Sequence, residues 1–410
     1  MKILLSAYAC EPGLGSEPAV GWHWAVELAR LGHEVRVLTR EANRPRIEQA
    51  LAGMAPAWRP GFLYYDLPRW TRRWKRGGRG IRLYYLLWQW GALRRAREVH
   101  ANEGFERVHH VTFAGVRQPS FMGRLGVPFV FGPLAGGERA PPRLRRGCGL
   151  RGRLLERLRD GANQLVRFDP LMAAAFRRAA RIYVTSEETR DLLPRRFRDK
   201  ARVALAIGWD GENALSGPAA ADDAADGGPL RLLFAGRLVH WKGLHLGLAA
   251  FRRLLDTGID ARLTVVGHGP DARRLRRIAR ELGLDGRIDW TPWLAREALA
   301  AVYVRHHVLL YPSLHDSGGM VVLEALGSGL PVVCLDLGGP GVLVDADCGR
   351  VVATAGRDER RVAADLAEAL AGLAADPEER RRLAAGARRR ADAFRWRRLV
   401  QGIYDEDRER

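Results

Sequence analysis

Two carboxylates placed eight residues apart, Asp316 and Glu324, are the strongest candidates for chemistry in this sequence. They lie in residues 311–333, where a strand pattern is followed by a polar, glycine-containing loop, a helix predicted from about Met320 to Gly327, and a further strand near Pro331. A loop that enters a helix N-terminus directs several backbone N–H groups at one point, where an anion can bind. Because carboxylates accept hydrogen bonds from hydroxyl groups, the pair suits a ribose or hexose beside a pyrophosphate.

Two cations occur at a second predicted strand end. Gly236 follows the strand, and Arg237 and Lys242 lie in the turn before the next helix. Cations in this position suit a diphosphate leaving group, whose developing charge must be stabilised. The next predicted strand ends in Gly267-His268-Gly269, a Gly-x-Gly turn that is a weak signal by itself.

The elements around these motifs alternate between strand and helix in both halves of the chain. In the first half, the strands are predicted at Lys2–Tyr8, Val35–Thr39, Arg107–Val111, Phe129–Phe131 and Ile182–Thr185, with a helix at Ala19–Leu31. In the second half, they are predicted at Leu230–Ala235, Arg262–Val266, Arg287–Trp290, Val308–Tyr311, Pro331–Cys334 and Gly349–Val352, with helices at Leu244–Leu255, Asp271–Leu282 and Val321–Gly327 and after Glu359. The alternation predicts an α/β protein with doubly wound parallel sheets.

The composition divides the chain into two Rossmann-like domains. Residues 211–229 are small, acidic and interrupted by glycine and proline, which is typical of an inter-domain linker. We therefore predict domains at 1–210 and 230–395 and a helical tail at 396–410. Ligands bind at the carboxyl ends of the strands in such sheets, so the active site is expected in the cleft between the domains.

Charge and cysteine content narrow the class of protein. The net charge is +20, and nearly all of the excess lies in residues 1–210, which favours phosphate-bearing partners. The four cysteines lack CxxC or zinc spacing and read as free thiols of a reducing cytoplasm, with Cys148 expected to be exposed among Arg and Gly. No apolar run approaches the ~20 residues that span a bilayer, and residues 1–7 read as a buried strand rather than a signal peptide.

The motif around the two acids resembles the retaining glycosyltransferases of the GT-B fold, family 4. The family pattern is an acid, seven residues and a Glu, in the context Pro-Ser…Glu-Ala…Gly-x-Pro-Val-Val, which this chain has around Asp316 and Glu324. The resemblance implies that Asp316 contacts the transferred sugar and that Glu324 binds the ribose hydroxyls. The family's first acid is normally Glu, and Asp-Ser-Gly-Gly here replaces its usual Glu-Gly-Phe-Gly.

The resemblance also implies further site residues. Arg237 and Lys242 would bind the donor phosphates, and one of His109 and His110 would be an active-site histidine, because strand neighbours point to opposite faces. The other donor-binding positions are Gly15, Gly236, Gly267, Gly269, Ser317, Gly318, Gly319, Met320 and Val321. The acceptor-side positions are Glu17, Gly136 and Glu138.

For the activity, the resemblance implies transfer of a sugar from a UDP- or GDP-sugar, with retention, to a lipid-linked or polysaccharide intermediate of bacterial cell-surface glycan synthesis. It also implies a C-terminal helix that packs back toward the N-terminal domain. Asp345-Ala346-Asp347 has the spacing of a metal motif but reads as a loop, so we expect a metal-independent enzyme without a cofactor.

Interleaved aromatic and basic residues favour an anionic membrane surface as a partner. Such residues interleave in segments 69–76 and 84–97, and the arginines of segments 143–146 and 151–159 add to the positive field. Together they predict a cytoplasmic protein that is peripheral on the inner face of the membrane. Two alternatives remain at this point. One is a sugar-nucleotide epimerase or phosphorylase on the same architecture. The other is a basic nucleic-acid-binding protein, although the sequence has no helix-turn-helix, RNA-binding or zinc-finger signature.

Overall fold

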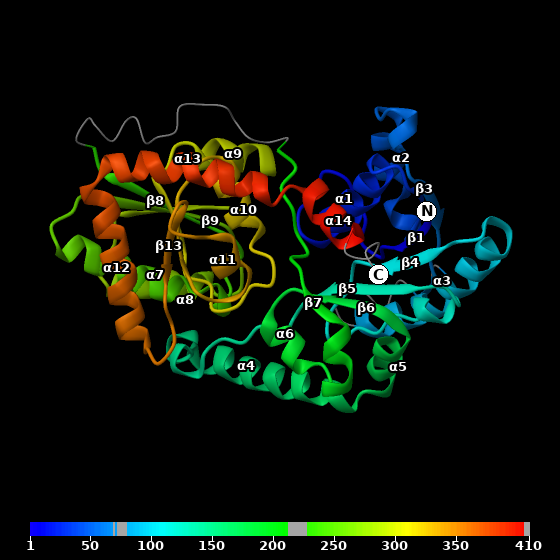
Figure 1. The fold of residues 1–410 in the computed structure, drawn as a ribbon. Coiled ribbons are helices and arrows are strands. Elements are labelled where there is room, and N and C mark those ends of the chain that lie inside the picture. Colours follow the sequence, from blue (N-terminus) through cyan, green and yellow to red (C-terminus); the bar gives the residue numbers. More distant parts are fainter. Residues whose placement is uncertain (69, 72–79, 212–227, 406–410) are drawn as a thin grey trace. The chain divides into compact units, whose positions relative to one another are not determined.

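The computed structural model describes residues 1–68, 70–71, 80–211 and 228–405. The chain forms two compact units (Figure 1). The first contains Met1–Gly137, Gly161–Ile207 and the residues from Trp396 onward, and the second contains Glu138–Asp160 and Gly208–Arg395. Residues 138–160 thus pack with the second unit, whereas the sequence predicts a division near residue 210. Of the predicted linker, residues 212–227 lie outside the described residues.

The first unit is built on a parallel sheet of seven strands in the order β3-β2-β1-β4-β5-β6-β7. The strands are β1 (Lys2–Ser6), β2 (Glu34–Thr39), β3 (Gly61–Tyr64), β4 (Arg107–His110), β5 (Phe129–Leu134), β6 (Ala179–Val184) and β7 (Ala201–Val203). The helices are α1 (Glu17–Arg30), α2 (Arg44–Ala52), α3 (Ile81–Glu103), α5 (Pro170–Arg178), α6 (Glu187–Leu192) and α14 (Trp396–Asp405). Helix α14 packs against α1, which confirms that the C-terminal helix joins the N-terminal fold.

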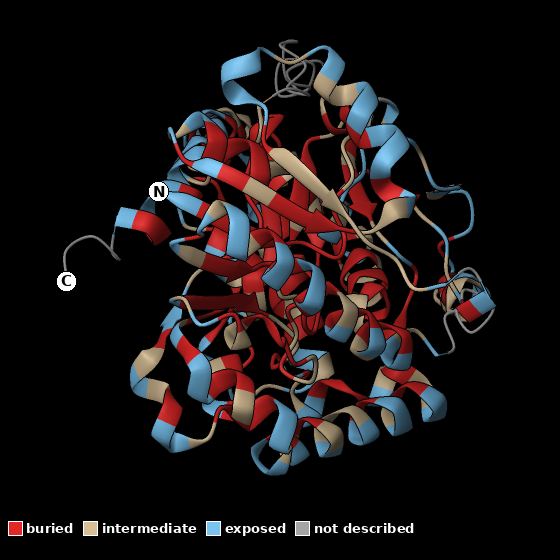
Figure 2. Cartoon of the chain, turned by 90° about the vertical axis from the view of Figure 1, so that its right-hand side faces the viewer, coloured by how far each residue is buried: buried red, intermediate tan, exposed pale blue. Residues whose placement is uncertain are grey.

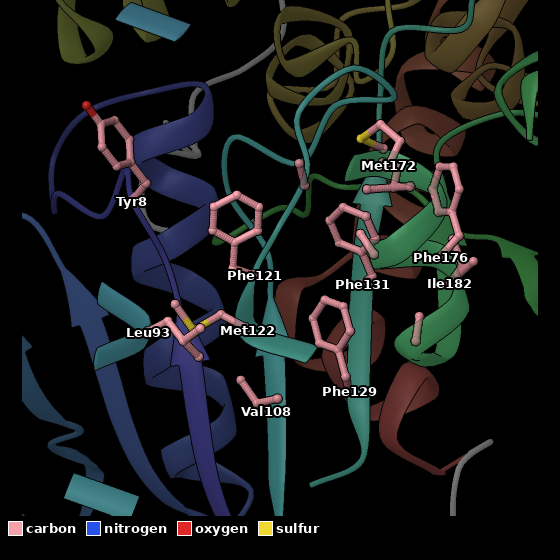
Figure 3. Close-up of a cluster of buried hydrophobic side chains, with 14 of the residues drawn as sticks. Tyr8, Leu93, Val108, Phe121, Met122, Phe129, Phe131, Met172, Phe176 and Ile182 are labelled. Carbon is pink, nitrogen blue, oxygen red and sulfur yellow. The ribbon is translucent and has the colours of Figure 1, made fainter. Parts of the chain in front are cut away.

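The core of the first unit lies where apolar strand residues meet the helices. Phe129 and Phe131 of β5 stack at 5.4 Å, and Phe176 of α5 contacts Phe131 (Figure 3). Each buried side chain of this size stabilises the fold by about 1.5–3 kcal/mol relative to exposure. Most residues of the central strands are accordingly buried, the edge strands β3 and β7 less so, and the outer sides of the helices are exposed (Figure 2).

Three aromatic side chains of α3 belong to this core, whereas the fourth, Trp90, is 47% exposed. Tyr84, Tyr85 and Trp88 are at most 1% exposed and sit in the apolar cluster of the first unit. They recur at helical spacing, so one side of α3 faces the sheet. The prediction that these rings meet a membrane is therefore wrong. Of the neighbouring segment 69–76, residues 69 and 72–76 lie outside the described residues.

The second unit is built on a parallel sheet of six strands in the order β10-β9-β8-β11-β12-β13. The strands are β8 (Leu230–Ala235), β9 (Ala261–Val266), β10 (Ile288–Thr291), β11 (Val308–Tyr311), β12 (Val332–Leu335) and β13 (Gly349–Val352). The helices are α7 (Leu244–Asp256), α8 (Ala272–Glu281), α9 (Arg296–Tyr303), α10 (Met320–Gly327), α11 (Gly338–Leu343), α12 (Glu359–Ala375) and α13 (Pro377–Ala393). Helices α7 and α12 pack together, and α10 packs with α13 (Figure 1).

A segment from the first half of the sequence completes the core of the second unit. Ala140, Leu144 and Cys148 are buried with the side chains of β8 and α7. Cys148 is only 3% exposed, so the prediction that it is exposed is wrong. All four cysteines are free and buried. Helix α4 (Gly149–Gln164) follows directly and carries the chain from the second unit to the first.

Both sheets reverse their strand order at one point. The reversal lies between β1 and β4 in the first unit and between β8 and β11 in the second. At such a point the connections from the two neighbouring strands run in opposite directions. The loops at the carboxyl ends of these strands therefore border a crevice, and doubly wound folds bind their ligands there. None of the described helices is both long and apolar enough to cross a bilayer.

Candidate active site

The loops after β8 and β11 bring Lys242 and Asp316 together at the reversal point of the second sheet. The Lys242 Nζ atom lies 2.5 Å from Oδ2 of Asp316 and donates to the Tyr311 hydroxyl, also at 2.5 Å. The Tyr311 hydroxyl donates to the same carboxylate oxygen at 2.7 Å. The adjacency of β8 and β11 thus makes one cluster of residues 74 positions apart in the sequence.

Asp316 is held as a carboxylate by its neighbours. Burial by itself raises the pKa of this group, but the Lys242 charge and the hydrogen bonds from Lys242, Tyr311 and the Gly318 N–H outweigh it. The pKa of Asp316 therefore lies below its usual range. An ionised carboxylate beside an ammonium gives the pocket an acceptor for sugar hydroxyls and a cation for phosphate.

Gly243 allows the two loops to touch. It has φ of 68° at the start of α7, and a Cβ there would overlap the carbonyl oxygen of Pro312. The left-handed conformation and the close approach both exclude a side chain. This glycine therefore sets the distance between the loop that carries Lys242 and the loop that carries Asp316.

We expect Gly243→Ala to destabilise the protein by about 2–5 kcal/mol, from about 1–2 kcal/mol for the left-handed backbone and about 1–3 kcal/mol for overpacking. Gly283 is the matched control, because it has φ of 64° and a Cβ there would meet nothing within 4 Å. Gly283→Ala should cost only the backbone part. Denaturant unfolding of both variants measures the difference in their free energies of unfolding. Equal losses of stability would show that the close approach to Pro312 adds nothing to the cost of the left-handed backbone.

The loop from Asp316 to Gly319 leads into the N-terminus of α10. Gly319 has φ of 75° at the helix start, and no side chain caps the helix there. The Gly318 N–H donates to Oδ1 of Asp316 at 3.3 Å, and the Gly339 N–H donates to the Asp316 carbonyl at 2.7 Å. Met320 and Val321 form the first turn of α10, where backbone N–H groups have no partner within the helix and can bind an anion.

Glu324 and Arg237 lie on the same unit but differ in their environments. Glu324 is half-buried, one turn inside α10, and accepts a hydrogen bond from the Tyr303 hydroxyl at 3.2 Å. Arg237 is exposed, and its guanidinium forms no hydrogen bond or ion pair with the residues that the structure describes, although its carbonyl accepts a hydrogen bond from the Val239 N–H. A guanidinium without a protein partner can pair with an added phosphate at no cost in existing ion pairs.

Three glycines bring the loops after β8 and β9 into contact. Gly236 and Gly267 have φ of 148° and 145°, and a Cβ on Gly267 would overlap the Gly236 carbonyl oxygen. A Cβ on Gly269 would likewise overlap the carbonyl oxygen of Leu238. These predicted donor-binding glycines therefore have a packing role that the structure accounts for.

Glu138 lies behind the loop of Asp316. Its side chain is 2% exposed, and its Oε2 atom accepts a hydrogen bond of 2.7 Å from the Ser317 hydroxyl. The sequence assigned Glu138 to the acceptor side and Ser317 to the donor side. In the structure both belong to the second unit, where Glu138 supports the loop that leads into α10.

Glu156 of α4 is a site residue that the sequence analysis missed. This carboxylate is 2% exposed, and its Oε1 atom lies 3.0 Å from Nε2 of His240 and 3.2 Å from Nε2 of His315. Burial alone raises its pKa, but the hydrogen bonds from the two histidines hold the pKa well below its usual range. His240 precedes Lys242 by two residues and His315 precedes Asp316, so one buried acid joins the two loops.

The histidines of β4 lie in the core of the first unit. His109 contacts the Tyr404 hydroxyl at 3.1 Å and the Gly132 carbonyl at 2.9 Å, while His110 contacts Ser6 at 2.9 Å and Tyr85 at 3.0 Å. Both side chains are 0% exposed, and burial lowers the pKa of each to about 3. They point to opposite faces of the sheet, as predicted, but neither lines an open site within this unit.

The loops of the first unit also meet at its strand reversal. Glu17, at the start of α1, accepts a hydrogen bond of 3.0 Å from the Phe113 N–H. Ser16 and Phe113 have φ of 61° and 54°, an uncommon conformation for residues other than glycine that clusters at functional sites. Gly15 precedes this pair in an exposed loop. Gly136, with φ of 101°, accepts a hydrogen bond from Asn163 at 2.8 Å.

The acidic motif Asp345-Ala346-Asp347 lies in a loop, as expected. Asp345 pairs with Arg390 at 3.2 Å, and Asp347 pairs with Arg382 at 3.2 Å. Within the described part of the chain, no group of three or more His, Cys, Asp or Glu side chains is arranged to hold a metal ion.

Two family models of glycosyl transferases match the two halves of the chain. The model of the glycosyl transferases group 1 matches residues 220–390, and the model of the glycosyl transferase 4-like domain matches residues 15–207. A D-inositol 3-phosphate glycosyltransferase of Saccharomonospora viridis is 35% identical over 246 residues, which are 56% of this chain and 56% of the relative. The two models together match most of the chain.

Two further proteins are similar. A GDP-mannose-dependent alpha-(1-6)-phosphatidylinositol dimannoside mannosyltransferase of Mycobacterium tuberculosis is 35% identical over 173 residues, 42% of each chain. The alignments thus span about half the length of the curated relatives. The structure of Anabaena HepE in complex with UDP superimposes with a TM-score of 0.63 over 100% of both chains, at 14% identity. The chain belongs to the group 1 glycosyltransferases of the GT-B fold.

Proposed function

We propose that this protein transfers a hexose from a UDP- or GDP-sugar to a hydroxyl acceptor with retention of anomeric configuration. The observation that carries the proposal is the cluster of Lys242 and Asp316 beside the uncapped N-terminus of α10. Its ammonium and backbone N–H groups suit a diphosphate, and its carboxylate suits sugar hydroxyls. Glu324 is proposed to accept hydrogen bonds from the ribose.

The proposed reaction needs stabilisation of the leaving group more than a strong nucleophile. The bond from C1 to the diphosphate oxygen breaks, the acceptor oxygen bonds to C1 on the same face, and the acceptor proton passes to the departing phosphate oxygen. Lys242, Arg237 and the dipole of α10 would offset the charge that develops on the diphosphate, so we propose that no metal ion is required.

The acceptor is proposed to be a lipid-linked or polysaccharide intermediate of bacterial cell-surface glycan synthesis. A lipid-linked acceptor would require the enzyme at a membrane surface, and the strongly basic first half of the sequence would be attracted to anionic lipid. The mycobacterial relative, whose name states that it acts on a phosphatidylinositol dimannoside, supports this class of acceptor.

A thermal-shift experiment with nucleoside diphosphates tests the donor site. We expect UDP or GDP to stabilise the protein by about 2.7 kcal/mol at about 100 times the Kd, in the presence of EDTA as well as without it. Glu324→Ala should abolish the shift because the ribose hydroxyls lose their acceptor. Glu281→Ala, on the exposed side of α8, is the matched control and should leave the shift unchanged.

Three results would contradict the proposal. An unchanged shift in Glu324→Ala would exclude the ribose contact, and a shift that needs a divalent cation would exclude metal independence. Product analysis with the stabilising nucleotide sugar distinguishes sugar transfer from epimerisation. Transfer releases a nucleoside diphosphate, whereas an epimerase returns an isomeric nucleotide sugar.

A further inference from the structure

Helix α4 turns its apolar side outward. Leu150, Leu154 and Leu158 follow one another at four-residue spacing and are 79%, 58% and 61% exposed, and Leu155 is 45% exposed. Residues at this spacing form one stripe along a helix. An amphipathic surface helix usually places such a stripe against its own core, so the outward stripe needs an explanation.

The inner side of α4 is polar and is fixed by specific contacts. Glu156 binds His240 and His315, and the Arg159 guanidinium donates to the Glu138 carbonyl at 2.6 Å. A Cβ on Gly152 would lie 3.0 Å from the His240 ring, so the helix is in close contact there. Rolling the helix to bury its leucines would expose these contacts and bury arginines. The leucine stripe is therefore not a displaced piece of the core.

The charges around the stripe are positive. Arg151 and Arg157 are exposed on the same helix, whereas its two acids face inward: Glu156 is buried and Asp160 pairs with Arg145 at 2.7 Å. A helix with leucines on its outer side and arginines beside them matches the boundary between anionic headgroups and acyl chains. Each basic residue near such a surface contributes about 1 kcal/mol to binding.

We propose that α4 docks this protein on an anionic lipid bilayer, with Leu150, Leu154 and Leu158 at the acyl-chain boundary and Arg151 and Arg157 among the headgroups. This inference rests on the proposed membrane association and names the surface that carries it. The same helix then meets lipid on its outer side and holds the loops of Lys242 and Asp316 through Glu156 on its inner side.

Co-sedimentation of the full chain with vesicles tests the surface. We expect binding to vesicles of phosphatidylglycerol and phosphatidylcholine, and at least tenfold weaker binding to phosphatidylcholine alone. Leu154→Gln/Leu158→Gln should weaken binding at least tenfold, while Leu154→Met/Leu158→Met, which keeps the apolar area, should bind as the wild type does. Arg157→Gln should reduce the salt dependence of binding, and Arg389→Gln on the exposed side of α13 should not.

The outcomes separate this inference from the proposed function. Vesicle binding that is unchanged in Leu154→Gln/Leu158→Gln would overturn α4 as the docking surface and leave membrane association intact. Failure of the wild type to bind vesicles would overturn both. Concentration-dependent self-association that the same variant abolishes, without vesicle binding, would assign the stripe to a second copy of the chain. An unchanged UDP or GDP thermal shift in the variant confirms that it is folded.

Discussion

Replacing Lys242 with Gln is expected to lower kcat by about 10²–10³, the usual cost of removing one group that stabilises charge in a transition state. The ammonium lies 2.5 Å from Asp316 and is proposed to face the departing diphosphate. The release of nucleoside diphosphate from the stabilising nucleotide sugar measures the loss. A kcat within tenfold of the wild type would show that Lys242 does not stabilise the leaving group.

The stability of the same variant separates catalysis from structure. Lys242→Gln leaves a carboxylate that is only 18% exposed without its cation, which costs at most about 3–5 kcal/mol, whereas removing both partners of a largely buried pair is often close to neutral. Lys242→Gln/Asp316→Asn should therefore recover much of the lost free energy of unfolding but none of the lost kcat. Equal stability of the single and double variants would show that the pair is effectively solvated.

The strands of the second sheet could be predicted from the sequence to within one residue at each end. Strands β8, β11 and β13 begin and end at the predicted residues, and apolar residues predominate in β8 and β11. The edge strand β3 (Gly61–Tyr64) was missed because it is short and only half-buried, so its residues do not alternate clearly. The sequence pattern does not distinguish the buried rings of α3 from a surface, because large rings beside basic residues occur at helical spacing in both settings.

The sequence could predict only those contacts of the candidate site that follow from the adjacency of two strands. Lys242 and Asp316 meet because their loops follow adjacent parallel strands, and strand alternation is visible in the sequence. The contacts of Glu138 and Glu156 depend on residues 138–160 joining the second unit, which no local pattern reports. One feature of the sequence does point to these contacts. In α4 the leucines recur at helical spacing, and Glu156 falls on the opposite side of the helix. Whichever side faces the protein, the helix must then either expose leucines or bury a carboxylate.

Glu156 links the loops of Lys242 and Asp316 through a carboxylate charge that protonation at low pH removes. Its pKa is lowered in the folded protein by hydrogen bonds from His240 and His315, against the effect of burial. A carboxylate accepts only, so both Nε2 atoms must carry the protons in this arrangement. A group whose pKa is depressed by folding stabilises the protein at a pH above its unfolded pKa, and this contribution is lost as the pH falls toward the folded pKa.

Glu156→Gln is therefore expected to be less stable than the wild type by about 1.5–3 kcal/mol at pH 7, since a neutral amide replaces a charged acceptor. The deficit should shrink as the pH falls below the ordinary value of 4.5 for a glutamate, because the wild type then loses the contribution of its charge. Glu378→Gln, whose carboxylate is 81% exposed, is the matched control and should cost less than about 1 kcal/mol at either pH.

As a positioning residue, Glu156 should also affect turnover through the loops of Lys242 and Asp316. We expect Glu156→Gln to lower kcat at pH 7 more than it raises KM for the nucleotide sugar, because the loops would bind the donor but hold Lys242 less well in place. Denaturant unfolding from pH 7 to pH 3.5, together with initial rates at pH 7, measures both effects. A deficit in unfolding free energy that is constant across this range would mean that the buried group is not a carboxylate held ionised by the two histidines.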